Sequence, residues 1–295
     1  MLIGHQQQWQ FLKKSIETKK ISHAYLFIGQ EKLGKKTLAK SWASLLLGAK
    51  DKDNYALSNL ILLEPANQEI KIAQIRDLIW QLSLKPLEQS KRVAIIDNAH
   101  LMNQEAQTCL LKTLEEPKGN SVLILITDKP VSLLPTILSR VQIIKFKPIK
   151  KEEIKKYLLT QGLNEKEAEE ISQISLGRPG RAIDFLLNKQ RRADFYQKIK
   201  EINNLIDAPL VNRFQYVKKL IQEETEVLNI LDIWLNYFRA KLICQTSNGK
   251  NQTDFNQISL KKLKKLLEKI QETKILISTT NINSQLALEN LMLEF

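Results

Sequence analysis

The 295-residue sequence predicts a mixed fold, an α/β domain built on a five-stranded parallel sheet followed by all-α segments. Two observations lead to this prediction. Five short apolar runs alternate with helical stretches over the first 148 residues, which is the pattern of a doubly wound sheet. After residue 148 the strand pattern stops, and apolar residues recur at helical spacing to the end of the chain.

The five predicted strands are nearly continuous in hydrophobicity and rich in Ile, Val and Leu, which is typical of parallel strands covered on both faces. They lie at 24–29, 59–64, 92–97, 121–127 and 141–147. The helices expected before and between them lie at 5–20, 37–48, 72–84, 103–116 and 131–138.

The change of pattern divides the chain into three predicted parts. Residues 1–148 form a nucleotide-binding-like α/β domain, 149–206 a small helical lid, and 207–295 a further helical domain. Helices after residue 148 are expected at 151–160, 164–175, 179–201, 209–224, 225–246, 258–275 and 281–294. The polar stretch 245–254 is expected to be a loop.

The chain is strongly basic, with a formal net charge of +13 and a pI of about 9.5. Such a balance favours an anionic partner such as nucleic acid. Coding from an AT-rich genome, which enriches Lys, Asn and Ile, explains the charge equally well. Charge alone therefore leaves DNA contact open.

The sequence predicts neither a membrane span nor a secretory signal. No apolar run approaches the ~20 residues of a membrane span, and the first residues lack the pattern of a secretory signal. We therefore expect a cytoplasmic protein with no membrane partner.

Cys109 and Cys244 lie far apart and form no C-x-x-C pair, which excludes a disulfide framework and a cysteine zinc cluster.

A phosphate-binding loop is predicted between the first strand and the next helix. Gly29, Gly34 and Lys35 fit the pattern G-x-x-x-x-G-K, in which backbone N–H groups and the lysine hold phosphates at a helix N-terminus. The next residue should carry a hydroxyl for Mg²⁺, but it is Lys36. Thr37 comes one residue later, and this shift turns its side chain by about 100° away from the metal. The loop is either a degenerate nucleotide site or a relic that only shapes the fold.

A second nucleotide-site motif ends the strand at 92–97. Asp97 stands where an acidic residue normally holds the Mg²⁺ shell. The following residue in hydrolysing proteins is a glutamate that orients water, and here it is Asn98, whose neutral amide cannot act as a base. His100 is close by, but we expect a solvated or capping histidine there.

With these motifs, the sequence resembles bacterial DNA polymerase III clamp-loader subunits, which are AAA+ proteins. The segments that carry the resemblance are HAYLFIG (23–29), GKKTLA (34–39), IRDL (75–78), VAIIDNAHLMNQEAQTCLLKTLEEP (93–117), LILITDKPVSLLPTILSR (123–140) and NINSQLALENLML (281–293). LLKTLEEP and LLPTILSR are specific as a pair, and the resemblance spans nearly the whole chain. It implies an AAA+ core, a helical lid, and a C-terminal helical oligomerisation (collar) domain.

Within this family the chain departs from the gamma and tau motor subunits. Lys36 replaces the hydroxyl residue, Asn98 replaces the glutamate, and Gly180 in LGRPGR falls where the sensor arginine of the lid would be. These losses match the delta-prime type of subunit. Many relatives carry a four-cysteine zinc module, but the corresponding stretch 48–59 is short and has no cysteine, so no zinc is expected.

The resemblance also gives Arg140 a role. The family's Ser-Arg-Cys motif is Ser139, Arg140 and Val141 here, and its arginine projects into the ATP site of a neighbouring motor subunit. An arginine finger places a permanent cation where charge develops on the γ-phosphoryl group. A surface arginine at a helix C-terminus is the alternative. Glu115 and Glu116, at a helix end, are expected to form a salt bridge within the domain.

The expected function is that of a non-motor, delta-prime-type subunit with no efficient ATPase of its own. The implied partners are gamma or tau and delta in a five-subunit ring, with the sliding clamp and primed DNA reached through the complex. ATP or ADP in the degenerate site is left open. Two rivals remain: a divergent gamma/tau-like ATPase, and a stand-alone basic DNA-binding protein. For the basic run 261–269, leucines at 263, 266 and 267 favour a buried stripe with solvated lysines.

Overall fold

The computed structural model describes residues 3–48, 59–65, 69–84, 91–117, 120–206, 208–222, 227–247, 259–280 and 282–295. The chain forms two compact units, Met1–Ile183 and Asp184–Phe295. Each is described here by itself.

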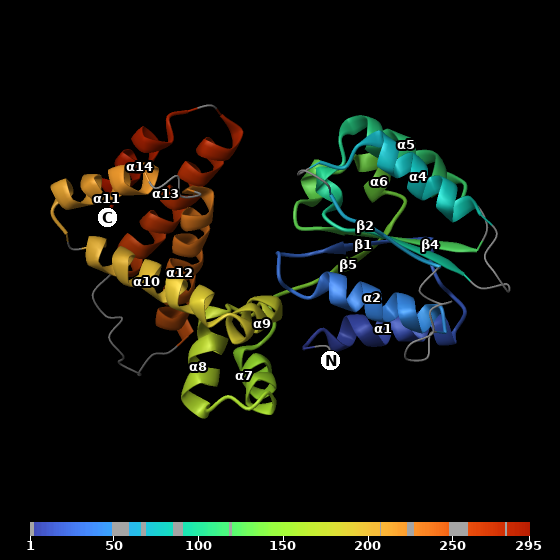
Figure 1. The fold of residues 1–295 in the computed structure, drawn as a ribbon, viewed down its shortest axis with the longest axis horizontal. Coiled ribbons are helices and arrows are strands. Elements are labelled where there is room, and N and C mark those ends of the chain that lie inside the picture. Colours follow the sequence, from blue (N-terminus) through green and yellow to red (C-terminus); the bar gives the residue numbers. More distant parts are fainter. Residues whose placement is uncertain are drawn as a thin grey trace. The chain divides into compact units, whose positions relative to one another are not determined.

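The first unit is built on the predicted five-stranded sheet (Figure 1). Its strands are β1 (Ala24–Ile28), β2 (Leu60–Leu63), β3 (Arg92–Ile96), β4 (Ser121–Thr127) and β5 (Gln142–Lys145). They follow the order β2-β3-β4-β1-β5, and every neighbouring pair is parallel. The expected fold class is therefore confirmed.

Helices cover both faces of this sheet (Figure 1). One face carries α1 (Gln6–Glu17) and α2 (Lys35–Leu46), and the other carries α4 (Ile72–Ser83), α5 (Gln104–Glu115) and α6 (Pro135–Leu138). Alternate residues of β1 supply the two cores, since Leu26 packs with the α4–α5 side and Phe27 with the α1–α2 side. This alternation is the two-residue period of a strand.

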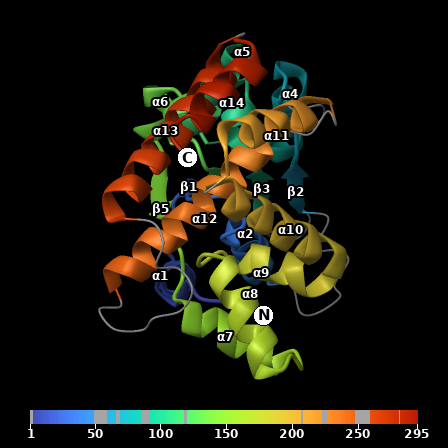
Figure 2. The same ribbon diagram turned by 90° about the vertical axis from the view of Figure 1, so that its left-hand side faces the viewer.

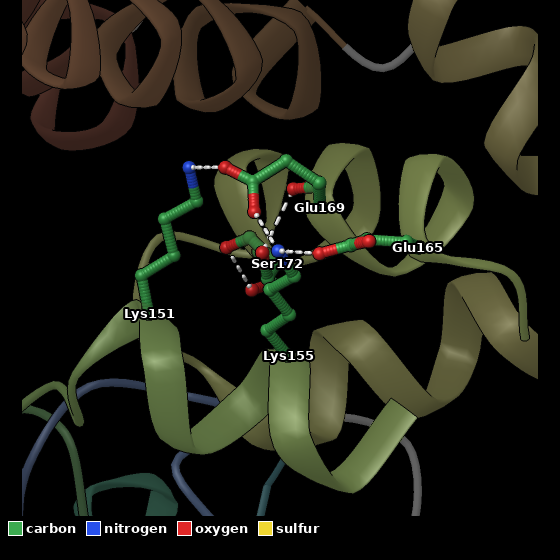
Figure 3. A network of polar contacts seen from close by, with 6 residues as sticks. Lys151, Lys155, Glu165, Glu169 and Ser172 are labelled. Atoms are coloured by element: carbon green, nitrogen blue, oxygen red, sulfur yellow. Dashed lines mark hydrogen bonds and ion pairs between the residues drawn. The ribbon is translucent and has the colours of Figure 1, made fainter. Parts of the chain in front are cut away.

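After β5 the chain forms the helical hairpin α7 (Lys151–Thr160) and α8 (Glu165–Ile174), followed by α9 (Pro179–Leu187). Figure 3 shows the polar network that joins α7 to α8. Lys155 contacts Glu165 at 3.2 Å and Glu169 at 3.0 Å, and Lys151 pairs with Glu169 as well. Ile154 and Ile171 are fully buried, so the apolar contact lies beneath this network.

The second unit is helical, as expected (Figure 2). It contains α10 (Lys189–Ile206), α11 (Leu210–Gln222), α12 (Val227–Ser247), α13 (Leu260–Thr279) and α14 (Ser284–Met292). Trp234, Phe238 and Phe295 form its aromatic centre, with ring centroids 5.7–5.9 Å apart around Phe295. Leu263 and Leu266 are fully buried and Leu267 partly so, which confirms the buried stripe predicted in the basic run.

The helix predicted over 179–201 is wrong, because the structure has two helices there. α9 ends at Leu187, and the Asn188 side chain caps the next helix by accepting a hydrogen bond from the Arg191 N–H at 3.0 Å. Ile202 and Ile206 of α10 belong to the core of the second unit. The division into 1–148, 149–206 and 207–295 stays a prediction, and α10 shares its core with the C-terminal helices.

Two further expectations concern helices and loops. Along the described ranges, no helix is long and apolar enough to cross a membrane. The predicted loop 245–254 overlaps the end of α12 up to Ser247, and its remainder lies outside the described residues.

Two leucines of α14 test the packing of the second unit. Leu288 is fully buried, whereas Leu286 is 62% exposed. Leu288→Ala should lower the free energy of unfolding by about 2–5 kcal/mol because it leaves a cavity. Leu286→Ala, the matched control, should change it by less than about 0.5 kcal/mol. Urea unfolding followed by circular dichroism measures both, and equal effects would contradict this packing.

Candidate functional site

The phosphate loop lies between β1 and α2. Gly34 is the N-cap of α2 and has φ 87°, a left-handed conformation that L side chains rarely adopt. Its carbonyl oxygen accepts the hydrogen bond of the Leu38 N–H at 2.9 Å, so the helix begins directly after the loop. The N-terminus of α2, which favours anions, therefore faces the loop.

Lys35 is turned back onto its own loop. Its ammonium donates hydrogen bonds to the carbonyl oxygens of Gly29 and of Gln30, the latter at 2.8 Å, and the residue is only 7% exposed. Burial lowers the pKa of Lys35, and the carboxylates of Asp128 and Asp97 partly oppose this. The amine that would hold phosphates thus satisfies backbone carbonyls.

Lys36 points at two carboxylates. Its Nζ lies 2.7 Å from Glu64 Oε1 and 3.0 Å from Asp97 Oδ2. Partial burial opposes the charge, but the hydrogen bonds with Glu64 and Asp97 raise the pKa of Lys36 overall. The Lys36 hydrogen bond in turn lowers the pKa of Glu64. Thr37 is exposed on the next position of the helix.

Asn98 has a structural role of its own. It adopts φ 51° and ψ 48° and precedes the short helix Ala99–Leu101. Asparagine is one of the few residues with a side chain that enters this left-handed region readily. Its N–H also donates to Asp97 Oδ1 at 3.0 Å, so both Asp97 oxygens have partners.

His100 is bonded to the end of β4. Its Nδ1 lies 3.2 Å from Asp128 Oδ1 and 3.3 Å from the Thr127 hydroxyl. Burial lowers the pKa of His100, although the Asp128 carboxylate acts in the opposite direction. The sequence predicts a solvated or capping histidine, but the His100 side chain is 11% exposed and bonded to Asp128 and Thr127.

Helix α9 contacts the phosphate loop directly. The Gly180 N–H donates to the Lys32 carbonyl oxygen at 2.8 Å, and the Arg178 Nε donates to Gln30 Oε1 at 3.1 Å. A Cβ atom at Gly180 would lie 2.8 Å from the Lys32 oxygen. A sensor arginine therefore has no room at position 180 in this arrangement.

Arg140 lies at the other edge of the sheet. It precedes β5, whose first residue pairs with Tyr25 near the start of β1, whereas the phosphate loop follows the end of β1. Its guanidinium lies 2.8 Å from Glu115 Oε1 and donates to the Thr136 carbonyl oxygen at 3.0 Å. The expected salt bridge of Glu115 is thus formed with Arg140 itself.

A buried amide positions the segment that leads to Arg140. Gln107 Nε2 donates to the carbonyl oxygens of Met102 and Ser132, each at 3.0 Å, and its Oε1 accepts from the Leu134 N–H at 2.8 Å. Sequence reasoning missed Gln107, as it missed Glu64, Gln30 and Lys32. A polar residue at an interior position of an apolar helix face was the available signal for Gln107.

The residues that the structure describes contain no group of three or more His, Cys, Asp or Glu side chains placed to hold a metal ion. Most of the stretch 48–59, on which the expectation of no zinc module rests, lies outside the described residues.

The strand order β2-β3-β4-β1-β5, with a phosphate loop after β1 and a helical hairpin after β5, defines a AAA+-type P-loop protein. The solved structure of a single-residue variant of Thermotoga maritima RuvB has the same fold, with a TM-score of 0.52 and 19% identity over 97% of this chain and 85% of that chain.

Comparison with known families narrows this class. Residues 4–150 match the family model described as DNA polymerase III, delta subunit. The chain is 37% identical over 168 residues to DNA polymerase III subunit delta' of Bacillus subtilis, covering 52% of this chain and 50% of that relative. It is 31% identical over 167 residues to DNA polymerase III subunit tau of the same organism, covering 52% of this chain and 30% of that relative. This part of the chain is similar to DNA polymerase III delta' subunits, in agreement with the resemblance expected from the motifs. The match spans about half the length of the delta' relative.

Gly180→Ala tests the contact between the lid and the loop. The added methyl group collides with the Lys32 backbone, so we expect a loss of about 1 kcal/mol or more in unfolding free energy despite the gain in helix propensity. Arg178→Ala, the control, removes the hydrogen bond to Gln30 without adding an atom against Lys32, and should cost no more than about 1 kcal/mol. Urea unfolding of the full chain measures both. A Gly180→Ala protein as stable as the parent would show that the loop and α9 are not in close contact.

Proposed function

We propose that the chain is a non-motor clamp-loader subunit of the delta-prime type, which acts on a neighbour's ATP site through Arg140. The observation that carries this proposal is the place of Arg140 at the amino edge of the sheet. The phosphate loop of the same domain is at the carboxyl edge. The four residues of β5 separate the two edges by about 13 Å. An arginine so placed is remote from the phosphate loop of its own domain, which supports a role at a neighbour's site.

Three features of the chain's own site support the proposal that it hydrolyses ATP only weakly. Lys36 replaces the metal-binding hydroxyl, Asn98 replaces the water-orienting carboxylate, and Gly180 replaces the sensor arginine. Lys36 forms an ion pair with Asp97, and Asn98 adopts a left-handed backbone conformation. Gly180 lies close to the backbone of Lys32. Gly29, Gly34 and the N-terminus of α2 could still accept the phosphates of ATP or ADP.

The partners follow from the family. The motor subunits gamma or tau would hold the ATP that Arg140 approaches, and delta would complete a five-subunit ring in the cytoplasm. The ring would place the sliding clamp on primed DNA. The helices of 207–295 would form the collar that holds the subunits together, and polymerase chemistry would belong to other chains.

Arg140→Ala in a reconstituted complex with the motor and delta subunits tests the proposal. The variant should fold normally, because a partly exposed ion pair contributes no more than about 1 kcal/mol. The motor site that receives Arg140 should slow by at least about tenfold, a smaller loss than the ~10³–10⁵ that arginine fingers contribute in GTPases. DNA-stimulated ATP hydrolysis by the complex is the measurement.

Glu115→Gln is the matched control, since it breaks the same ion pair and keeps the arginine. Its complex should hydrolyse ATP at the parent rate or faster. If Arg140→Ala leaves the rate unchanged, or if both variants lower it equally, Arg140 acts only within its own domain and the proposal fails.

A further inference from the structure

Two carboxylates meet at the carboxyl edge of the sheet. Glu64 follows β2 and Asp97 follows β3, and these strands pair in register with Leu63 opposite Ile96. The Asp97 N–H donates to the Leu63 carbonyl oxygen at 2.9 Å, which extends the pairing to the residues that carry the acids. Two like charges at adjacent strand ends repel each other unless a cation lies between them.

Lys36, in the first turn of α2, supplies that cation. It is the second residue of α2, and its Nζ lies within 3.0 Å of one oxygen from each carboxylate. A positive charge in the first turn of a helix is unfavourable by itself. The two carboxylates therefore stabilise the charge of Lys36, and Lys36 in turn reduces the repulsion between the carboxylates.

Mg²⁺ does not fit this arrangement. It requires near-octahedral oxygen ligands at about 2.0–2.1 Å. One Asp97 oxygen is bonded to the Asn98 N–H and the other to Lys36, and the hydroxyl next along the helix, that of Thr37, is on an exposed position. The ammonium nitrogen is bonded to the carboxylate oxygens that would have to coordinate the ion.

We infer that Lys36 is a built-in counter-cation that replaces Mg²⁺ at this site, so that the site excludes divalent cations. Two lysines, Lys35 and Lys36, then provide positive charge in the first turn of the helix that follows the loop. Any phosphate ligand of this site would be a metal-free nucleotide or polyphosphate, bound by the backbone N–H groups at the start of α2. The inference deepens the proposed degenerate site and rests on that assignment.

Mn²⁺, which replaces Mg²⁺ and is visible by electron paramagnetic resonance, tests the inference on the full chain. Wild type should show no Mn²⁺ binding that depends on Asp97. Lys36→Thr frees both carboxylates and restores a hydroxyl at the family position. It should bind Mn²⁺ about fivefold more tightly than wild type, which corresponds to the upper end of the range for one partly exposed charge pair. Lys36→Thr/Asp97→Asn should lose this gain.

Lys36→Arg keeps the positive charge and should behave as wild type. Circular dichroism of each variant establishes that it is folded, and the charge-retaining variant keeps the test valid if Lys36→Thr is unstable. Mn²⁺ binding by wild type that Asp97→Asn abolishes would overturn the inference, as would Mn²⁺ binding by Lys36→Arg equal to that of Lys36→Thr. Because the readout is metal binding, failure here leaves the role of Arg140 untouched, and failure of the Arg140 experiment leaves this result standing.

Discussion

The parallel pairing of β1 between β4 and β5 is the constraint on which the arrangement of the chain's functional groups depends. In a parallel sheet all carboxyl ends meet at one edge, and all amino ends meet at the other. The phosphate loop, Glu64 and Asp97 therefore gather at one edge, whereas Arg140 and Glu115 lie at the other. One sheet thus separates the phosphate loop from Arg140, the group that we propose acts on a neighbour's site.

The three departures from a hydrolysing site share a physical character. Each replacement is satisfied by the chain's own atoms, so the site needs no ligand to be complete. Lys36 neutralises two carboxylates, Asn98 occupies a left-handed turn that suits asparagine, and Gly180 lets a helix N–H reach the phosphate loop. This internal satisfaction supports the proposal that the chain hydrolyses ATP weakly in its own site.

Most of the fold could be predicted from the sequence, because parallel strands are continuous apolar runs and amphipathic helices repeat every 3.6 residues. The predicted strand 121–127 agrees residue for residue, and the others agree within two residues at each end. The break at Asn188 could not be predicted, since a single capping side chain separates two helices of similar pattern.

The site was only partly predictable. Motif spacing identified Lys36, Asp97 and Asn98, but Glu64 joins them only through the register of β2 and β3. Gln107 likewise acts through bonds to residues up to 27 positions away, which no local pattern reveals. The reason for Gly180 became clear only when the structure placed Lys32 against it.

The central claim is that this chain contributes to ATP chemistry in another subunit and performs little in its own site. Steady-state ATP hydrolysis by the purified full chain, with Mg²⁺ and without partners, tests it most directly, using Asp97→Asn as the reference. The account predicts that the two proteins hydrolyse ATP at the same background rate. Sustained Mg²⁺-dependent turnover by the parent chain that Asp97→Asn abolishes would contradict it.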